Sequence, residues 1–234
     1  MSRYAALYPK ARPRLRGVRW LQPVYRAWLQ WKYRGGADVS RVEFAGMKLF
    51  LRPGVFNPAQ FLTTGTLVEA VAREAIPPGA RWLELGTGSG AIALCAARRG
   101  AAVIATDINP EAVACARENA AALGLAVEVR AGDLFVPVAG ERFDVVVFHP
   151  PYFAGAQSQG LGPAWHYGDV PRRFAEGLAE HLAPGGVGML LLSSNGDCAA
   201  YLEALEAAGF ALEIAFEREL IMELAVVYRV KRGS

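Results

Sequence analysis

A glycine at every second position marks the strongest chemical feature of the sequence, Gly86-Thr87-Gly88-Ser89-Gly90. Glycines allow a tight turn and let a ligand approach the backbone closely. The run alone also fits a dinucleotide loop, because residues 88–93 have the spacing GxGxxA. Glu84 separates the two possibilities. A pyrophosphate needs no negative charge there, whereas a carboxylate would stabilise the ammonium and sulfonium groups of S-adenosylmethionine. The pattern therefore favours S-adenosylmethionine over the NAD of a dehydrogenase.

Two further acidic residues follow the next two predicted strands. Asp107 lies 21 residues after Gly86, where a carboxylate can accept hydrogen bonds from both hydroxyls of a ribose, and Ile108 follows it. A cap for the next helix is the alternative role of Asp107. Asp133 and Leu134 end the third strand, where the carboxylate would accept from the adenine amine and the leucine would cover the ring. Together these residues predict a site for an adenosine group.

The fourth predicted strand ends in His149-Pro150-Pro151-Tyr152. Two prolines fix an extended, rigid turn and expose the carbonyl groups around them, and an aromatic ring follows. A stiff loop that only reverses the chain is the alternative. We predict His149, Pro150 and Tyr152 to be catalytic residues, because the loop follows a strand over the expected ligand crevice. Weaker candidates for substrate contact are Pro151, Phe56 and His166, although a lone histidine in a loop is more often an exposed residue.

Strands and helices alternate from residue 66 onward. Apolar runs and alternating runs predict the strands, and the 3.6-residue period predicts the helices. The strands are expected at 81–85, 102–106, 127–131, 145–148, 188–192, 213–217 and 220–230. The helices are expected at 67–75, from the glycine run to about 99, and at 110–123, 172–182 and 198–208. Such alternation predicts a parallel, doubly wound α/β sheet with its ligands at the carboxyl ends of the strands. A hairpin is expected at 41–51.

In this order, the motifs resemble a class I S-adenosylmethionine-dependent methyltransferase of the small domain superfamily, in its HemK-like branch. The resemblance covers residues 41–234 and implies a doubly wound, seven-stranded, Rossmann-like sheet. Members of the superfamily methylate planar or exocyclic nitrogens, which implies a nitrogen acceptor on an RNA base or on a protein side-chain amide. The resemblance and the motifs together assign the cofactor contacts to Glu84, Gly86, Thr87, Gly88, Gly90, Asp107, Ile108, Asp133, Leu134 and His149.

One residue departs from the family pattern, because His149 stands where the family has Asn. In the family, the Asn side-chain oxygen and the carbonyl of the following proline accept hydrogen bonds from the substrate amine. Neutral imidazole has a single acceptor nitrogen. His149 would either replace the Asn as acceptor or act as general base in a small-molecule methyltransferase, on oxygen or nitrogen. A third possibility is a protein that binds S-adenosylmethionine without turnover.

The charge is unevenly distributed along the chain. The net charge is +3, yet residues 1–37 contain nine basic and no acidic residues, which leaves a net charge of −6 on the remainder. We expect a basic, aromatic helical arm at 1–40, with an apolar face between about 18 and 33, attached to a methyltransferase domain at 41–234. Residues 1–34 would bind RNA or a ribonucleoprotein, pack on the domain, or cover a small substrate.

The composition excludes several classes of protein. No apolar run is long enough to span a membrane, and no apolar segment follows the basic N-terminus as it does in a secretory signal. The cysteines Cys95, Cys115 and Cys198 lack the spacing of metal ligands. We therefore expect reduced thiols, no metal site, no stable membrane insertion and a cytoplasmic protein.

Overall fold

The computed structural model describes residues 19–21, 24, 40–59, 62–75, 77–150, 169–194, 196–220 and 223–233. Most of the expected basic arm lies outside these residues. Within the arm, the 3-10 turn η2 spans Arg19–Leu21, and Trp20 and Val24 are both largely exposed. The apolar helical face and the domain boundary at residue 40 therefore stay predictions. No helix in the described part of the chain is long and apolar enough to cross a membrane.

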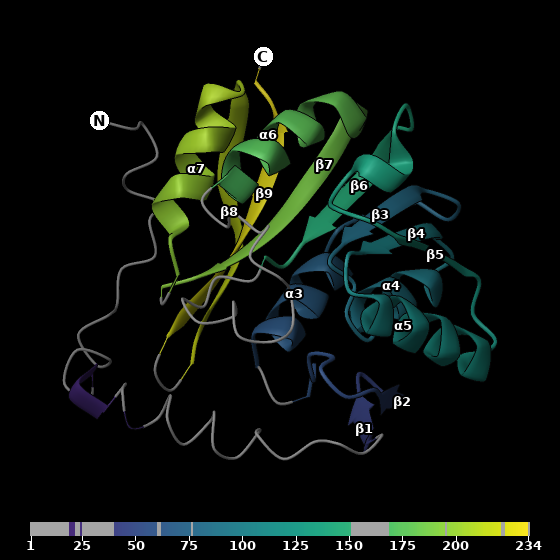
Figure 1. Ribbon diagram of the computed structural model, residues 1–234. Coiled ribbons are helices and arrows are strands. Elements are labelled where there is room, and N and C mark those ends of the chain that lie inside the picture. The colour runs from purple at the N-terminus through teal and green to yellow at the C-terminus, as the bar shows by residue number, and fades with distance from the viewer. Residues whose placement is uncertain are drawn as a thin grey trace.

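Seven strands form one sheet in the order β5-β4-β3-β6-β7-β9-β8 (Figure 1). Their bounds are β3 Arg81–Leu85, β4 Ala102–Asp107, β5 Val127–Ala131, β6 Phe143–Phe148, β7 Leu182–Ser193, β8 Phe210–Glu219 and β9 Leu224–Arg232. All seven predicted strands are present. The expectation of an entirely parallel sheet is wrong for β9, which runs antiparallel to β7 and β8. Only four residues join β8 to β9, and so short a connection permits only an antiparallel pair.

Five α-helices and a 3-10 turn pack around the sheet in the described part of the chain. They are α3 Leu62–Ala72, α4 Ala91–Ala97, α5 Pro110–Leu123, η3 Val136–Val138, α6 Val170–His181 and α7 Cys198–Ala207. α5 has the predicted bounds, because the Asn109 side chain caps its first turn and Gly124, with a φ of 65°, ends it. α3 begins five residues before its predicted start, at a Thr- and Gly-rich turn that intrinsic helix propensity disfavours.

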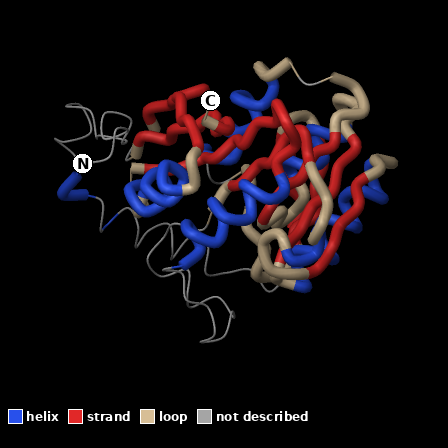
Figure 2. The backbone as a smooth tube through the Cα atoms, turned by 90° about the horizontal axis from the view of Figure 1, so that it is seen from above, coloured by secondary structure: helices blue, strands red, loops and turns tan. Residues whose placement is uncertain are grey.

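The sheet separates two apolar cores, and helices lie on both sides of its strands (Figure 2). Successive side chains of a strand point to opposite faces. Leu83 and Leu85 of β3 accordingly pack with residues of α6 and α7, whereas Trp82 packs with residues of α3, α4 and α5. The alternation places Glu84 on the same face as Trp82, toward α4 and away from α6.

The predicted hairpin at 41–51 is confirmed as β1 Ser40–Phe44 and β2 Met47–Leu51. The buried side chains of Met47 and Leu49 pack against α4 and α5. The fully buried Asn119 of α5 fixes the hairpin further. Its Oδ1 accepts from the Phe50 N–H (2.7 Å), and its Nδ2 donates to the carbonyl groups of Phe50 and Ser89 (2.9 Å each). Asn119 thus joins the hairpin to the glycine run.

We expect Asn119→Ala to lower the free energy of unfolding by about 3 kcal/mol, because each buried polar group left without its partner costs about 1–3 kcal/mol. Equilibrium unfolding in urea measures the change. The matched control is Asn57→Ala, which removes one exposed hydrogen bond to the Ala59 N–H and is expected to cost less than about 0.5 kcal/mol. A loss below about 1 kcal/mol for Asn119→Ala would contradict the proposed role of the side chain.

Candidate cofactor and substrate site

The glycine run forms the turn between β3 and α4, at the carboxyl edge of the sheet. Gly86, Gly88 and Gly90 have φ values of 67°, 56° and 83°, a left-handed conformation that residues with a Cβ rarely adopt. The N–H of Thr87 donates to the carbonyl of Thr106 in β4 (3.0 Å). The turn is therefore attached to the end of the neighbouring strand, and its backbone is held where a ligand at that edge would meet it.

The Glu84 carboxyl group lies beneath the glycine run and is only 2% exposed. Its Oε2 accepts hydrogen bonds from the Thr87 hydroxyl (2.7 Å) and from the Ala93 N–H of α4 (2.9 Å). Burial raises the pKa of this carboxyl to about 8, although both hydrogen bonds act to lower it. At neutral pH the group is therefore largely protonated. A negative charge on Glu84 thus does not distinguish S-adenosylmethionine from NAD, contrary to what the sequence alone suggested. Through its two hydrogen bonds, Glu84 attaches the glycine turn to α4. Direct contact with the cofactor stays a prediction.

Asp107 ends β4 beside the glycine run. Its Oδ2 accepts from the Gly88 N–H (2.8 Å), and its Oδ1 accepts from the Asn109 N–H (2.9 Å). Burial raises the pKa of Asp107, and the backbone hydrogen bonds oppose this effect. The alternative role of Asp107 as the cap of α5 is wrong, because Asn109 occupies the cap position. Asp107 instead links two loops at the place expected for a ribose.

Asp133 and Leu134 form the turn after β5, next to the end of β4. The hydroxyl of Thr106 donates to the Leu134 carbonyl (3.1 Å). Oδ2 of Asp133 forms an ion pair with Arg173 of α6. Its Oδ1 is buried and accepts no hydrogen bond from any described residue. A buried acceptor without a donor fits an amine such as that of adenine.

His149 follows β6 at the same edge of the sheet, because Leu85 of β3 pairs with Phe148 of β6. Phe56, from the segment after β2, meets the His149 ring edge to face, with 5.9 Å between ring centroids and an angle of 86°. Burial lowers the pKa of His149 to about 4, so the imidazole is neutral at physiological pH. The fold thus brings together two predicted site residues that are far apart in sequence.

The rest of the predicted catalytic loop is only partly visible. Pro150 is buried directly after His149. Pro151, Tyr152 and His166 lie outside the described residues, so their predicted roles stay predictions. Among the residues that the structure describes, no cluster of His, Cys, Asp and Glu has an arrangement suited to a metal ion.

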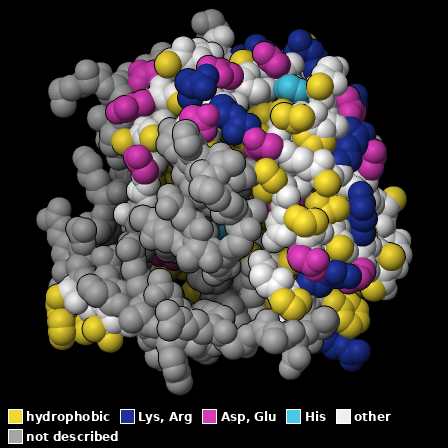
Figure 3. Space-filling model, viewed as in Figure 1, with side chains coloured by type: hydrophobic (Ala, Val, Ile, Leu, Met, Phe, Trp, Pro, Cys, Tyr) yellow, Lys and Arg dark blue, Asp and Glu magenta, His cyan; other side chains and the backbone are white. Residues whose placement is uncertain are grey.

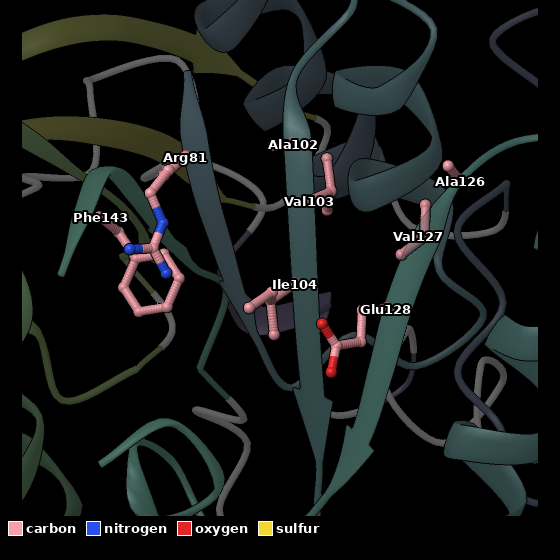
Figure 4. A pocket seen from close by; sticks show the side chains of 8 residues that line it. All are labelled: Arg81, Ala102, Val103, Ile104, Ala126, Val127, Glu128 and Phe143. Carbon is pink, nitrogen blue, oxygen red and sulfur yellow. The ribbon is translucent and has the colours of Figure 1, made fainter. Parts of the chain in front are cut away.

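A separate hollow of about 490 Å³ opens over the first halves of β3, β4, β5 and β6 (Figure 4). In it the Arg81 guanidinium lies over the Phe143 ring, 5.2 Å from the centroid. Ligands of doubly wound sheets bind beyond the carboxyl ends of the strands, so this hollow is distinct from the cofactor site. On the face of the molecule that is seen in Figure 1, acidic and basic side chains are intermingled over the described residues (Figure 3).

The described residues fit S-adenosylmethionine, since the left-handed glycine turn, the Asp107 carboxylate and the unpaired Asp133 oxygen occur together at one edge of the sheet. Comparison with known families decides the assignment, because residues 46–208 match the methyltransferase small domain. The chain belongs to this family. It is an S-adenosylmethionine-dependent methyltransferase with a Rossmann-like fold, as the sequence predicts.

Three relatives illustrate the range of this methyltransferase family. A Methanocaldococcus jannaschii protein, provisionally named a protein N5-glutamine methyltransferase, is 30% identical over 82% of the chain and 98% of its own length. The release factor glutamine methyltransferase of Cereibacter sphaeroides is 42% identical over 63% of the chain but only 58% of its own length. A T. thermophilus 16S rRNA methyltransferase, solved with AdoMet and guanosine, is 26% identical with a TM-score of 0.63, over 83% of the chain and 50% of its own.

Two residues at the site of this methyltransferase escaped the sequence reasoning. Asn119 reads as one more polar residue of a helix, and Arg173 as one of two adjacent arginines in α6. A weak signal existed for Asn119, because it is polar on the face of α5 that carries Cys115, Ala116 and Ala120. No local signal marks Arg173, whose partner Asp133 lies 40 residues away.

Proposed function

We propose that this methyltransferase transfers the methyl group of S-adenosylmethionine to a nitrogen of a macromolecule, a protein side-chain amide or an RNA base. The position of the His149 imidazole, beside Phe56 at the end of β6, is the observation that supports this most directly. A neutral ring nitrogen can accept a hydrogen bond from the N–H of an acceptor amine. A group with a pKa of about 4 is a weak base at neutral pH, which disfavours the alternative in which His149 deprotonates a hydroxyl.

The proposed mechanism is a direct in-line transfer. S-adenosylmethionine, when bound, supplies an electrophilic methyl group on its sulfonium. His149 and the Pro150 carbonyl would accept the two N–H hydrogen bonds of the acceptor and hold its nitrogen with the lone pair toward the methyl group. Phe56 would cover the acceptor and exclude water from one side. Because the product nitrogen can release its proton to water, His149 positions the acceptor without being protonated, and most of the rate comes from orientation.

We propose the cofactor contacts that the sequence predicts, except that Glu84 and the Thr87 hydroxyl support the glycine run. Asp107 binds the ribose hydroxyls, while Asp133 and Leu134 receive the adenine. The backbone of the run Gly86 to Gly90, with Ile108, lines the remainder of the cofactor. Glu84 and the Thr87 hydroxyl support this backbone from beneath, in agreement with their mutual hydrogen bond.

We propose a protein side-chain amide as the first acceptor to test, because two relatives have names that refer to protein glutamine. We propose that the reaction takes place in the cytoplasm. The chain spans 42–73% of the length of seven release factor enzymes that it matches, and a release factor is one substrate within this proposed class. An RNA base is supported by the likeness to a ribosomal RNA enzyme. The basic residues 1–34 would hold either acceptor, and the domain division at residue 40 would separate this contact from catalysis.

Transfer of labelled methyl groups into a fractionated cell extract tests the proposal. The purified protein is incubated with methyl-labelled S-adenosylmethionine and the extract, which is then separated into protein, RNA and small molecules. We expect label in protein that acid hydrolysis releases as methylamine, the product of an N-methylated amide, or in RNA that nuclease renders soluble. An Asp107→Ala protein is the blank for enzymes of the extract. Label confined to small molecules would contradict a macromolecular acceptor.

A further inference from the structure

The turn that contains Asp133 has an unusual backbone on both sides of this residue. Gly132 has a φ of 150°, and a Cβ there would lie 2.4 Å from Cγ of Pro137. Leu134 has a φ of 46°, which is rare for a residue with a side chain. The N–H of Gly132 donates to the Asp107 carbonyl (2.9 Å). The backbone at Asp133 is therefore held by its neighbours, so the direction of its carboxylate is set mainly by its partners.

The described partner of the Asp133 carboxylate is an arginine of another element. Arg173 lies in the first turns of α6, and its Nη2 donates to Oδ2 of Asp133. Both side chains are partly buried, with 31% and 26% of their surfaces exposed. The other nitrogen of the guanidinium, Nη1, lies 4.0 Å from Asp169, at the start of α6. A guanidinium is planar and always charged, so it restricts the orientation of the carboxylate that it binds.

The two carboxylate oxygens of Asp133 have different environments. Oδ2 is taken by Arg173, while Oδ1 is buried and has no donor among the described residues. A buried acceptor without a hydrogen bond is costly, and a ligand that brings a donor recovers this cost. The amine of adenine is such a donor. A 6-oxo purine has a carbonyl oxygen at the same position, which an ionised carboxylate can only repel.

Apolar side chains other than Arg173 attach α6 to the sheet. The buried side chains of Val170, Phe174, Ala175 and Leu178 pack α6 into the core. Arg173 projects from the same helix toward the turn after β5 instead. Its neighbour Arg172 is 62% exposed and forms an ion pair with Glu176 one turn further along the same helix (2.7 Å). Arg172 therefore lacks the contact with Asp133, and it also differs from Arg173 in its greater exposure and in having no ion pair with Asp169 among the described residues.

From this geometry we infer that Arg173 is a positioning residue that fixes Asp133 with Oδ1 toward the purine, and that it thereby sets the selectivity of the enzyme for adenine over 6-oxo purine in the cofactor. The inference rests on the proposed contact between Asp133 and adenine. A carboxylate released from Arg173 can rotate or be hydrated, and its Oδ1 is then no longer held toward the amine of the purine. A site built to hydrogen-bond one group rejects its analogue strongly only while its polar groups stay fixed.

Binding of two cofactor products tests the inference. S-adenosylhomocysteine and its 6-oxo analogue S-inosylhomocysteine are titrated calorimetrically into the wild type, Arg173→Gln and the control Arg172→Gln. We expect the wild type and Arg172→Gln to prefer the adenine ligand by at least about 100-fold, as sites that read a single polar group do. For Arg173→Gln we expect about 10-fold weaker binding of the adenine ligand, little change for the analogue, and a selectivity reduced about 10-fold.

The possible failures of this test are distinguishable. A wild type that does not bind S-adenosylhomocysteine would contradict the cofactor site itself, and one that binds both ligands equally would contradict the Asp133 contact. A selective wild type together with an equally selective Arg173→Gln would overturn the inference alone, even if that variant melts at a lower temperature. Thermal unfolding of all three proteins identifies such a purely structural effect, because lost stability weakens both ligands alike.

Discussion

Replacement of Asp107 by alanine is expected to weaken the binding of S-adenosylmethionine by at least about 100-fold, because hydrogen bonds to a charged group contribute about 1.5–3 kcal/mol each. The carboxylate accepts from the Gly88 and Asn109 N–H groups, and both loops lose their common anchor when it is removed. The proposed ribose contact is lost as well. Isothermal titration calorimetry measures the change directly.

Two further variants show whether the Asp107 effect is specific. Asp107→Asn has nearly the same size but replaces one acceptor by an NH2 group, which must then face a backbone N–H, so we expect a similar loss. Glu128→Gln removes an exposed carboxylate from the neighbouring strand β5 and is expected to bind normally. Binding by Asp107→Ala within about threefold of the wild type would refute the assigned role, since such a difference is below 1 kcal/mol.

Local sequence signals were sufficient to predict the bounds of those helices and strands whose ends carry capping or turn residues. α5 has the predicted bounds because a capping Asn, a first-turn Pro and a terminal Gly stand in succession at its ends. β3 and β5 also have their predicted bounds. The direction of β9 was missed although its cause is local, because the short connection after β8 permits only an antiparallel pair. The start of α3 was missed because Thr63, Thr64 and Thr66 are buried by tertiary packing against their local propensity.

For the site, strand order was enough to place residues but not to orient them. Glu84 is the penultimate residue of β3, and Asp107, Asp133 and His149 end or follow β4, β5 and β6 at the same edge of the sheet, as predicted. The strand alternation that puts Leu83 and Leu85 toward α6 turns Glu84 toward α4, where burial largely neutralises it. The sequence shows the charge of Glu84 but not the face of the sheet to which its side chain points. Contacts between distant elements, such as the one between Phe56 and His149, follow only from the folded chain.

The second large effect is expected at His149. With saturating cofactor and the acceptor identified by methyl labelling, His149→Ala should lower kcat about 100-fold, because an acceptor N–H buried without its partner costs about 1–3 kcal/mol. His149→Asn should retain kcat within about tenfold of the wild type, since an amide oxygen accepts the same hydrogen bond but cannot take up a proton at neutral pH. The pair of variants therefore separates an acceptor from a general base. Equal, low rates for both would indicate that a basic nitrogen is required.

The pH dependence gives an independent test of the same residue. Burial lowers the pKa of His149 to about 4, whereas an exposed histidine titrates near 6.5. Between these values the unfolded chain binds the proton and the native state does not, so this group's contribution to stability is full above pH 6.5 and is lost as the pH falls toward 4.

His149 should therefore add no inflection to kcat between about pH 6 and 8. We compare kcat rather than kcat/KM, because Glu84, with a pKa of about 8, titrates in the free enzyme. An inflection of kcat near pH 6.5 that disappears in His149→Asn would show that the imidazole is solvated and titrates in the working enzyme. Such a result would favour the general-base mechanism.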